Sequence, residues 1–472
     1  CDHHLPGDEL PDAVAVLKCT GSGESGSQEK RHPETTSTSG ISADSVGQAV
    51  QLTATVSEYK GLTQLGGSIL NFSVLHGGAK QALPAVVALS LPMPAYANWE
   101  RYEGMRVRIT GSTGPLVVTD NYYLGRYGMV TLSDKDKLVQ YTELNVPSMT
   151  GNAAYLDTVK RSQIILDDGS SKQNPDALLG RGGLDLSAGN TLRAGDSTAA
   201  IEGILDQFID TAAGAHQTSY RVQPLQKPIF TGAARPTVAD LQQAIGSPTV
   251  KIASANVLNF FSTLGTAKFN NPYGDSLEGR GADNAAELTR QTDKIVSNLL
   301  GLDADVYGLM EIQNNGFDTT SALATLTRAL NAKHGSEVYD YVKGPFNAGG
   351  AKTAVAAGHD AISVAVIYRK DRVNPVGVPA VPDEAQYDAF NATYGNRVPL
   401  AQTFEKTLAS GGKDQFTVVV NHLKSKGSVN DPDIGDGQGA NNQSRKRAVE
   451  QLQTWLAGNP TQAGNGKNVL MG

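Results

Sequence analysis

Three polar side chains stand at or beside the ends of apolar segments in the second half of the chain. Asn256 follows the apolar start of TVKIASANVLNFF, Glu311 ends DVYGLME, and His422 lies near the end of QFTVVVNHL. A glutamate carboxylate suits Mg²⁺ or Ca²⁺, because these hard cations prefer oxygen donors. An asparagine amide can bind the same ion weakly or hold a phosphate oxygen. A histidine can serve as general acid or base near neutral pH.

Each residue also has a purely structural alternative. Asn256 could satisfy a strand end, Glu311 could be a solvated charge, and His422 could be a packed, hydrogen-bonded core residue. Apolar strands alternate with amphipathic helices around them, which predicts a layered α/β domain whose site lies where strand ends converge. The predicted strands are 249–261, 305–311, 360–369, 415–423 and 467–471, and the predicted helices are 283–303, 321–335 and 445–458.

The region before this domain has a different texture. VGQAVQLTATVSEY alternates apolar and polar residues, and YEGMRVRITGS repeats the glycine-plus-alternation pattern. Short strand candidates and no long helical pattern predict an all-β region of the OB-like kind, as two small barrels or a split sheet. The predicted divisions are a polar, loop-like or disordered segment 1–45, the all-β region 46–225, a linker 226–247 with one short helix, and the α/β domain 248–472.

Composition narrows the class of protein. A net charge of −7 over 472 residues argues against a passive polyanion binder, but not against an enzyme that acts on nucleic acid. The two cysteines, Cys1 and Cys19, exclude a disulfide framework and a cysteine-rich zinc site. One disulfide between them would suit an oxidising compartment, and two free thiols fit equally well. No uninterrupted apolar run reaches the ~18 residues of a membrane span.

Several strings carry a family resemblance, and they occur in the family's order. They are ASANVLNFF (253–261), RGADNAAELTRQTDKIV (280–296), LMEIQNNG (309–316), GHDAISVAVIYR (358–369), VVVNHLKSKGS (418–428), DIGDGQGANNQSRKRAVEQL (433–452) and NVLMG (468–472). With them, residues 248–472 resemble the secreted bacterial nucleases of the endonuclease/exonuclease/phosphatase, or DNase I-like, superfamily. VSEYKGLTQL and YEGMRVRITG are similar to the OB-like region that precedes the nuclease domain in long extracellular DNases. The resemblance implies a four-layered α/β sandwich, two face-to-face sheets between helices.

The same resemblance implies metal-dependent phosphodiester hydrolysis and gives roles to the three residues. Glu311 falls on the family's metal-ligand glutamate, and Asn256 on the asparagine that helps position metal and phosphate. His422 falls on one of two histidines that flank the scissile phosphate. We therefore expect all three to be catalytic, with Mg²⁺ or Mn²⁺ as the ion and Ca²⁺ as a structural or co-activating candidate.

Further residues in these strings are candidates for substrate binding. Asn421 adjoins the catalytic histidine, and Lys424 and Lys426 could hold the nucleic-acid backbone or form a solvated basic loop. Asp360 fits a phosphate site and a structural role equally. Arg369 could touch phosphate or be a surface arginine at a strand end.

One departure from the family pattern matters. In the family the phrase matching NVLMG continues with Asp-x-Asn, and an Asp-His follows later; the 472 residues contain neither continuation. We therefore expect the chain to be truncated inside the nuclease domain and inactive by itself. For the natural protein we expect an extracellular nuclease, secreted and free or associated with the cell surface, that acts on DNA, with RNA as the alternative substrate. No protein partner can be inferred.

Two other functions stay open. A phosphomonoesterase or a lipid phosphodiesterase could use the same fold, because a fold does not fix a substrate. A catalytically inactive module that binds nucleic acid or matrix would fit the missing motifs, although the negative net charge disfavours it.

Overall fold

The computed structural model divides into two compact units, residues 1–235 and 236–472, which are described separately. Among the helices described, none has both the length and the apolar composition needed to cross a membrane. Residues 1–45, with Cys1 and Cys19, lie outside the described residues, so their predictions stay untested. The structure describes residues 46–59, 62–169, 175, 179–187, 189–210, 217–344, 358–391, 395–427, 431–463 and 466–472.

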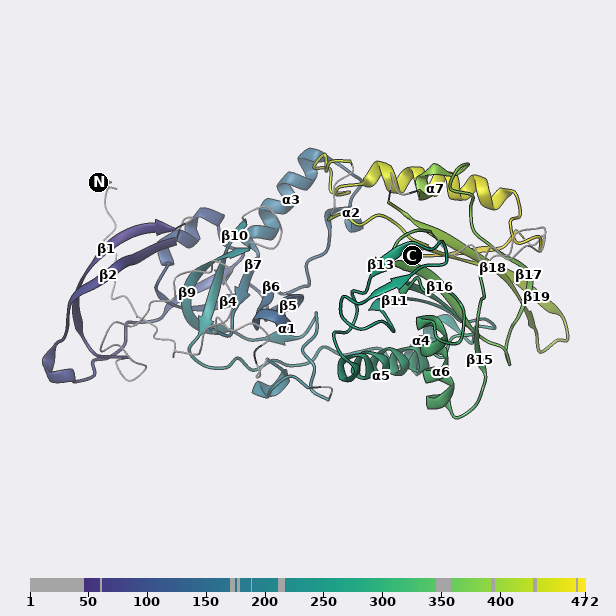
Figure 1. The fold of residues 1–472 in the computed structure, drawn as a ribbon. Helices are drawn as coiled ribbons and strands as arrows, with labels where there is room; N and C mark the ends of the chain where they lie inside the picture. Colours follow the sequence, from purple (N-terminus) through teal and green to yellow (C-terminus); the bar gives the residue numbers. More distant parts are fainter. Residues whose placement is uncertain are drawn as a thin grey trace. The chain divides into compact units, whose positions relative to one another are not determined.

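The first unit is built around one eight-stranded sheet, with a separate hairpin formed by β1 and β2 (Figure 1). Its strands are β1 (Val50–Tyr59), β2 (Leu62–Val74), β3 (Val87–Leu91), β4 (Arg106–Gly111), β5 (Leu116–Asp120), β6 (Val130–Asp134), β7 (Gln163–Leu166), β8 (Ser197–Thr198), β9 (Ile201–Asp210) and β10 (Gln217–Pro224). The strand order in the sheet is β3-β4-β9-β10-β7-β6-β5-β8. These eight strands form one continuous sheet, and the OB-like character of the region stays a prediction.

The prediction that residues 46–225 are all-β is wrong for one segment, because the 13-residue helix α3 (Met149–Arg161) lies within it. The Ser148 side chain caps this helix by accepting a hydrogen bond from the Gly151 N–H. Only Asn152 of the helix is buried, so no apolar stripe reveals it in the sequence. Two one-turn helices, α1 (Leu124–Tyr127) and α2 (Tyr141–Leu144), precede it.

The second unit has a mixed α/β organisation with two four-stranded sheets. The first sheet has the order β11-β14-β16-β15, from β11 (Ile252–Phe260), β14 (Val306–Gln313), β16 (Ile362–Arg369) and β15 (Tyr339–Tyr341). The second has the order β17-β18-β19-β20, from β17 (Asn374–Ala380), β18 (Arg397–Thr407), β19 (Lys413–His422) and β20 (Asn468–Met471). A small hairpin pairs β12 (Lys268–Asn270) with β13 (Ser276–Glu278).

Four helices belong to this unit, within the described ranges: α4 (Val238–Ile245), α5 (Ala285–Leu302), α6 (Ala322–His334) and α7 (Asn442–Ala457). Apolar residues of α5 and α6 share one core cluster with one face of the first sheet. Asn284 and Ser321 cap these two helices through their side chains. Figure 1 shows α5 and α6 on one side of the sheets and α7 on the other.

The two sheets pack face to face through a second core cluster, to which α7 adds Leu452 and Trp455. Gly308 of β14 permits the close approach. A Cβ at this position would clash with the Met471 side chain and lie 2.8 Å from Val420 Cγ2. Strands β14 and β16 are buried on both faces, which explains their nearly continuous apolar sequences.

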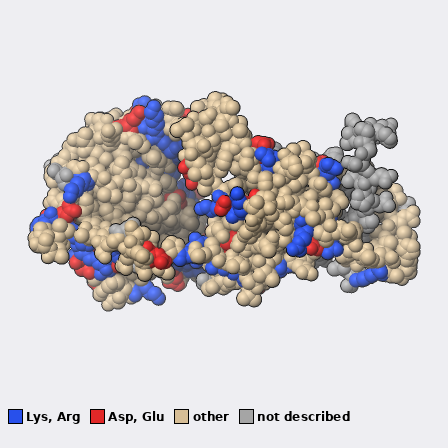
Figure 2. All heavy atoms as spheres, turned by 180° about the vertical axis from the view of Figure 1, so that it is seen from behind, with Lys and Arg blue, Asp and Glu red and all other residues tan. Residues whose placement is uncertain are grey.

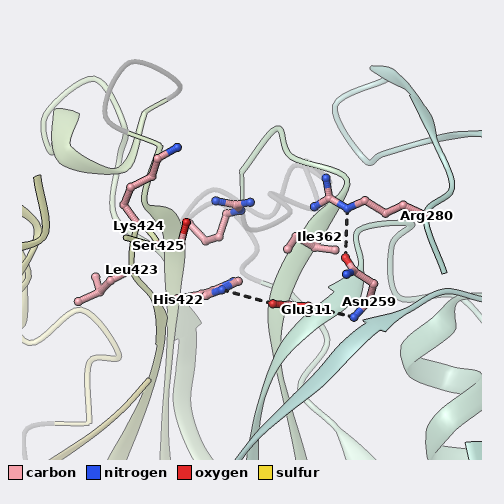
Figure 3. Close-up of a pocket in the computed structure, with 9 residues that line it drawn as sticks. Asn259, Arg280, Glu311, Ile362, His422, Leu423, Lys424 and Ser425 are labelled. Atoms are coloured by element: carbon pink, nitrogen blue, oxygen red, sulfur yellow. Dashed lines mark hydrogen bonds and ion pairs between the residues drawn. The ribbon is translucent and has the colours of Figure 1, made fainter. Parts of the chain in front are cut away.

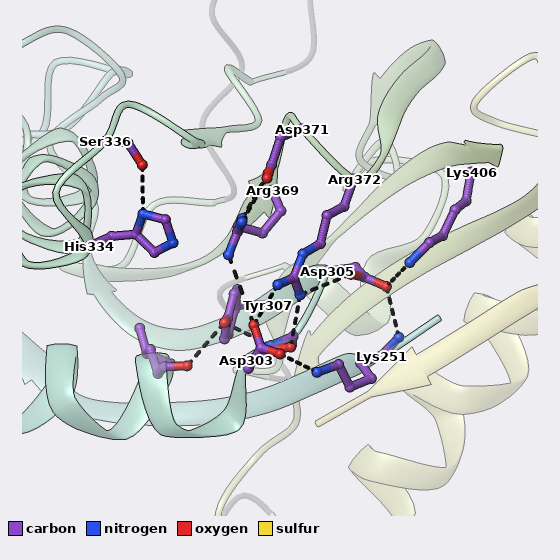
Figure 4. A network of polar contacts seen from close by, with 12 residues as sticks. Lys251, Asp303, Asp305, Tyr307, His334, Ser336, Arg369, Asp371, Arg372 and Lys406 are labelled. Atoms are coloured by element: carbon purple, nitrogen blue, oxygen red, sulfur yellow. Dashed lines mark hydrogen bonds and ion pairs between the residues drawn. The ribbon is translucent and has the colours of Figure 1, made fainter. Parts of the chain in front are cut away.

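At the start of β14 a buried carboxylate ties the two sheets together (Figure 4). Asp305 is 1% exposed and accepts hydrogen bonds from Lys406 Nζ of the second sheet (2.6 Å) and from the Lys251 N–H (3.0 Å). Arg372 donates to it from the turn after β16 (3.4 Å). A buried carboxylate is stable only when its charge is compensated, and here three donors do so.

Asp303 extends this network towards solvent. It pairs with Lys251 and accepts a hydrogen bond from Arg372 (2.8 Å). Burial alone would raise the pKa of Asp303, but the hydrogen bonds from Lys251 and Arg372 outweigh it and lower the pKa below its usual range. The contribution of Asp303 to stability is therefore complete above its unfolded pKa of ~3.9 and is lost as the pH falls through the lower folded value.

We predict that the Asp303→Asn variant loses stability less steeply than the parent chain as the pH falls below about 4, because the amide that replaces the carboxylate has no proton to take up. Urea unfolding of the second unit can be followed by Trp455 fluorescence in a Trp99→Phe background, since the chain has two tryptophans. Equal slopes for the two chains would show that Asp303 is not stabilised as an anion.

Candidate functional site

Strand ends from both sheets of the second unit enclose a pocket of about 380 Å³ (Figure 3). Glu311 comes from β14, Arg397 from the start of β18 and His422 from the end of β19. The pocket is lined by Asn259, Arg280, Glu311, Ile362, Arg397, His422, Leu423, Lys424 and Ser425. Glu311 and His422, from different sheets, therefore line the same pocket.

An irregular backbone brings Glu311 into this position. β11 and β14 pair in register as far as Asn256 and Met310, and pairing resumes only at Phe260 and Ile312. The bulge between them leaves Leu258 and Asn259 on β11 with φ of +52°, and Glu311 on β14 with φ of +67°. Residues other than glycine rarely adopt this left-handed backbone conformation. Strained backbone of this kind is found most often at functional sites.

The Glu311 carboxylate is held by both sides of this bulge. Asn256 Nδ2 donates a hydrogen bond to Oε1 (2.8 Å), and the Asn259 N–H donates to Oε2 (3.0 Å). His422 Nε2 lies 3.8 Å from Oε1, an ion-pair distance when the imidazole is protonated. Asn256 Oδ1 accepts a hydrogen bond from the Leu258 N–H (2.8 Å), which fixes the amide. The three predicted catalytic residues thus form one connected group.

The surroundings of the His422 imidazole disfavour its protonated form. Burial lowers its pKa, and repulsion by Arg397 lowers it further, while Glu311 and Asp360 act in the opposite direction. Its Nδ1 atom is buried and has no hydrogen-bond partner among the described residues. A neutral imidazole at this position can accept a proton, as a general base must.

Positive charge dominates the pocket wall, where Arg280, Arg397 and Lys424 face the single carboxylate of Glu311. Asp360 orients the two arginines: Arg280 Nη2 donates to it (3.0 Å), and Arg397 Nη2 forms an ion pair with it (2.9 Å). Arg280 Nε also donates to Asn259 Oδ1 (3.1 Å). Such a wall suits an anionic group with several oxygens, because arginine donors match phosphate geometry.

Sequence reasoning assigned no site role to three of these residues, Arg280, Arg397 and Asn259. Arg397 starts β18, which is not among the strands predicted from the sequence. The packing of the two sheets brings this residue to the pocket. Asn259 was visible as a polar residue inside the apolar string ASANVLNFF. Asp360, for which a phosphate site and a structural role fitted equally, pairs with and positions two arginines of the pocket.

The structure does not place all predicted substrate-binding residues in the pocket. Asn421 is buried, and its Nδ2 donates to the carbonyls of Val419 (3.2 Å) and Met471 (3.0 Å), so it joins the ends of β19 and β20. Lys426 is exposed on the following loop and does not line the pocket. Lys424 is the member of this group that does line it.

Arg369, for which a phosphate contact and a surface position at a strand end were both left open, lies at the opposite end of β16 from the pocket and does not line it. This strand has eight residues and spans about 25 Å at ~3.3 Å per residue. Arg369 is buried, bonds to Asp371 (2.7 Å) and lies 5.2 Å above the Tyr339 ring (Figure 4). It therefore belongs to the polar network at the far end of the sheets.

Glu311 and Asn256 are the residues that would hold a metal ion beside the pocket. No group of three or more His, Cys, Asp or Glu side chains that could hold an ion is found where side chains are described. Glu311 and Asn256 offer one carboxylate and one amide, which fits Mg²⁺ or Mn²⁺ completed by water and a substrate phosphate. Ca²⁺, which takes six to eight oxygen ligands, would need more water or further protein oxygens at this pair, and its structural or co-activating role stays a prediction.

Comparisons with known proteins give little. No family model matches the chain, and no curated protein matches it. One similar solved structure is the crystal structure of endonuclease/exonuclease/phosphatase from Beutenbergia cavernae DSM 12333. The identity is 16%, the alignment covers 38% of this chain and 39% of that chain, and the TM-score is 0.20. The pocket geometry therefore has to carry any functional conclusion.

We predict that Glu311→Gly is more stable than Glu311→Ala by about 1 kcal/mol, because glycine adopts a positive φ without the Cβ penalty. Both variants lose the same two hydrogen bonds, so the difference isolates backbone strain. Urea unfolding measures it. Equal stability of the two variants would show that the backbone at position 311 is unstrained.

Proposed function

We propose that the pocket hydrolyses phosphodiester bonds, with DNA as the main substrate class and RNA as the alternative. One observation carries the proposal: two arginines and a lysine surround a neutral histidine and a carboxylate at converging strand ends. Cations bind the phosphate, the histidine handles a proton, and the carboxylate supports a metal ion. Each of these functions is needed when water attacks an anionic phosphodiester.

Arg280, Arg397 and Lys424 would bind the non-bridging oxygens of the phosphate. Because Asp360 holds both guanidinium groups in place, little reorganisation is needed when the phosphate enters. Figure 2 shows one face of the molecule, where basic and acidic residues are interspersed without an extended basic surface. Local attraction inside the pocket therefore matters more than a general field, in keeping with the net charge of −7.

His422 would take a proton from the attacking water at Nε2, the nitrogen that faces Glu311. The water oxygen then bonds to phosphorus, and the bond from phosphorus to the leaving oxygen breaks. Glu311 stabilises the resulting imidazolium across 3.8 Å. A Mg²⁺ or Mn²⁺ ion held by Glu311 and Asn256 would neutralise charge on the phosphate oxygens.

The broader assignments belong to the same proposal. The sequence of layers, with α5 and α6, then two sheets, then α7, supports a four-layered sandwich. We further propose that the sheet of the first unit is OB-like and presents nucleic acid, and that the natural protein acts outside the cell. These two points rest on the sequence resemblance.

A phosphomonoester or a lipid phosphodiester is the second candidate substrate class. The pocket volume of about 380 Å³ favours it, since sites for small ligands start near ~300 Å³. The same cations and the same histidine would act on either substrate. Hydrolysis of these esters without hydrolysis of DNA would replace the proposed function.

We predict that His422→Ala lowers plasmid cleavage by the whole natural protein about 10²- to 10⁴-fold in Mg²⁺, the usual contribution of a general base. Chelator should abolish cleavage by the parent protein. His334→Ala is the matched control, because this exposed histidine lies at the end of α6, outside the pocket. Undiminished cleavage by His422→Ala would contradict its role, and DNA binding without turnover would favour an inactive binding module.

We also predict that Arg397→Gln weakens DNA binding and lowers the slope of log affinity against log salt by about one, because one phosphate contact is lost. Fluorescence anisotropy of a labelled oligonucleotide in chelator measures this without turnover. Arg290→Gln on the exposed face of α5 is the control and should leave the slope unchanged. An unchanged slope for Arg397→Gln would remove Arg397 from the phosphate site.

A further inference from the structure

Two aromatic rings stack on the surface of the second unit. The Tyr273 and His359 rings lie 4.1 Å apart between centroids, with 26° between their planes. Tyr273 is 41% exposed, and the His359 side chain is 53% exposed. Neither residue lines the pocket. Since aromatic rings usually gain stability by burial, an exposed pair held in a stack points to a surface that meets another ring.

The Tyr273–His359 stack is held by hydrogen bonds from two separate segments. His359 Nδ1 lies 2.7 Å from Asp275 Oδ2, and because a carboxylate can only accept, Nδ1 carries the proton. This hydrogen bond and one from Asn271 Nδ2 (2.8 Å) lower the pKa of Asp275. Asn271 Nδ2 also donates to the His359 carbonyl (3.3 Å). A ring fixed in this way loses little freedom when a ligand binds.

The stack lies close to the phosphate-binding wall. His359 directly precedes Asp360, so the Cα atoms of the two residues are about 3.8 Å apart. The Asp360 carboxylate in turn holds Arg280 and Arg397, which line the pocket. When these arginines bind one phosphate of a substrate, a neighbouring part of that substrate can contact the Tyr273 and His359 rings.

The surroundings of the stack select against another phosphate. Asp275, whose pKa is lowered below its usual range, is an anion that hydrogen-bonds to the His359 ring. A second phosphate would be repelled there, whereas an uncharged flat ring would not. Every nucleobase has such a face, so stacking on aromatic side chains tolerates any sequence.

We propose that the Tyr273–His359 stack is a base-binding subsite, which receives the nucleobase next to the phosphate held in the pocket. The proposal rests on the proposed function, because it requires a nucleic acid as the substrate. It gives the site a preference for polynucleotides over phosphate esters that have no base.

The test compares two labelled tetranucleotides, one with normal bases and one with tetrahydrofuran abasic residues throughout. Binding to the 472-residue chain is measured by fluorescence anisotropy in chelator. We expect His359→Ala and Tyr273→Ala to weaken binding of the normal tetranucleotide about tenfold, within the range known for base–aromatic stacking. Binding of the abasic tetranucleotide should change less than about twofold, because no base is present to stack.

Two further variants separate stacking from folding. His359→Phe keeps a ring but loses the hydrogen bond to Asp275, and it should retain most of the affinity lost in His359→Ala. His334→Ala, an exposed histidine outside both sites, should bind like the parent chain.

Equal losses on the normal and the abasic tetranucleotide, or no loss on either, would overturn the subsite. Because the assay contains no turnover, this result is independent of hydrolysis. A failure to hydrolyse DNA in the plasmid assay would overturn the proposed function. The base-binding subsite would then still be tested by the tetranucleotide binding assay alone.

Discussion

The placement of one carboxylate, Glu311, is the constraint on which the site depends. Its backbone is in the left-handed region, and the bulge of the neighbouring strand supplies donors to both of its oxygens. Without the bulge, alternation along β14 would turn this side chain to another face. The irregular strand end thus fixes the carboxylate relative to Asn256 and sets the distance to His422 on the other sheet.

The distance between Glu311 and His422 is in turn a property of the sheet packing. Gly308 allows β14 to approach β19 and β20, and three residues earlier the Asp305 carboxylate accepts a hydrogen bond from Lys406 of the second sheet. These two contacts limit sliding of one sheet against the other. Pocket residues from the two sheets can therefore keep a fixed geometry, which catalysis and anion binding both require.

Much of this arrangement could be predicted from the sequence. Apolar runs and amphipathic periodicity gave β14, β16 and α5 to within two residues at each end. The sequence placed Asn256, Glu311 and His422 at or beside the ends of apolar segments. In the structure Asn256 and Glu311 lie inside β11 and β14, where the bulge brings their side chains together. Arg369 was also expected at a strand end, but it lies at the end of β16 away from the pocket. The sequence predicts where a strand ends, but it does not show which of the two ends faces the site. The place of Arg397 in the pocket could not be predicted, because the packing of the two sheets brings the start of β18 there. Helix α3 could not be predicted either, because most of its residues face solvent and form no apolar stripe.

The most direct test of the account is the source of the oxygen in the product. The whole natural protein would cleave an oligonucleotide in ¹⁸O-labelled water with Mg²⁺ under single-turnover conditions, and mass spectrometry would locate the label. The account predicts one ¹⁸O atom in each new terminal phosphate, formed at a rate that depends on His422. Cleavage without ¹⁸O in the phosphate, or label incorporation at the same rate in His422→Ala, would contradict the account.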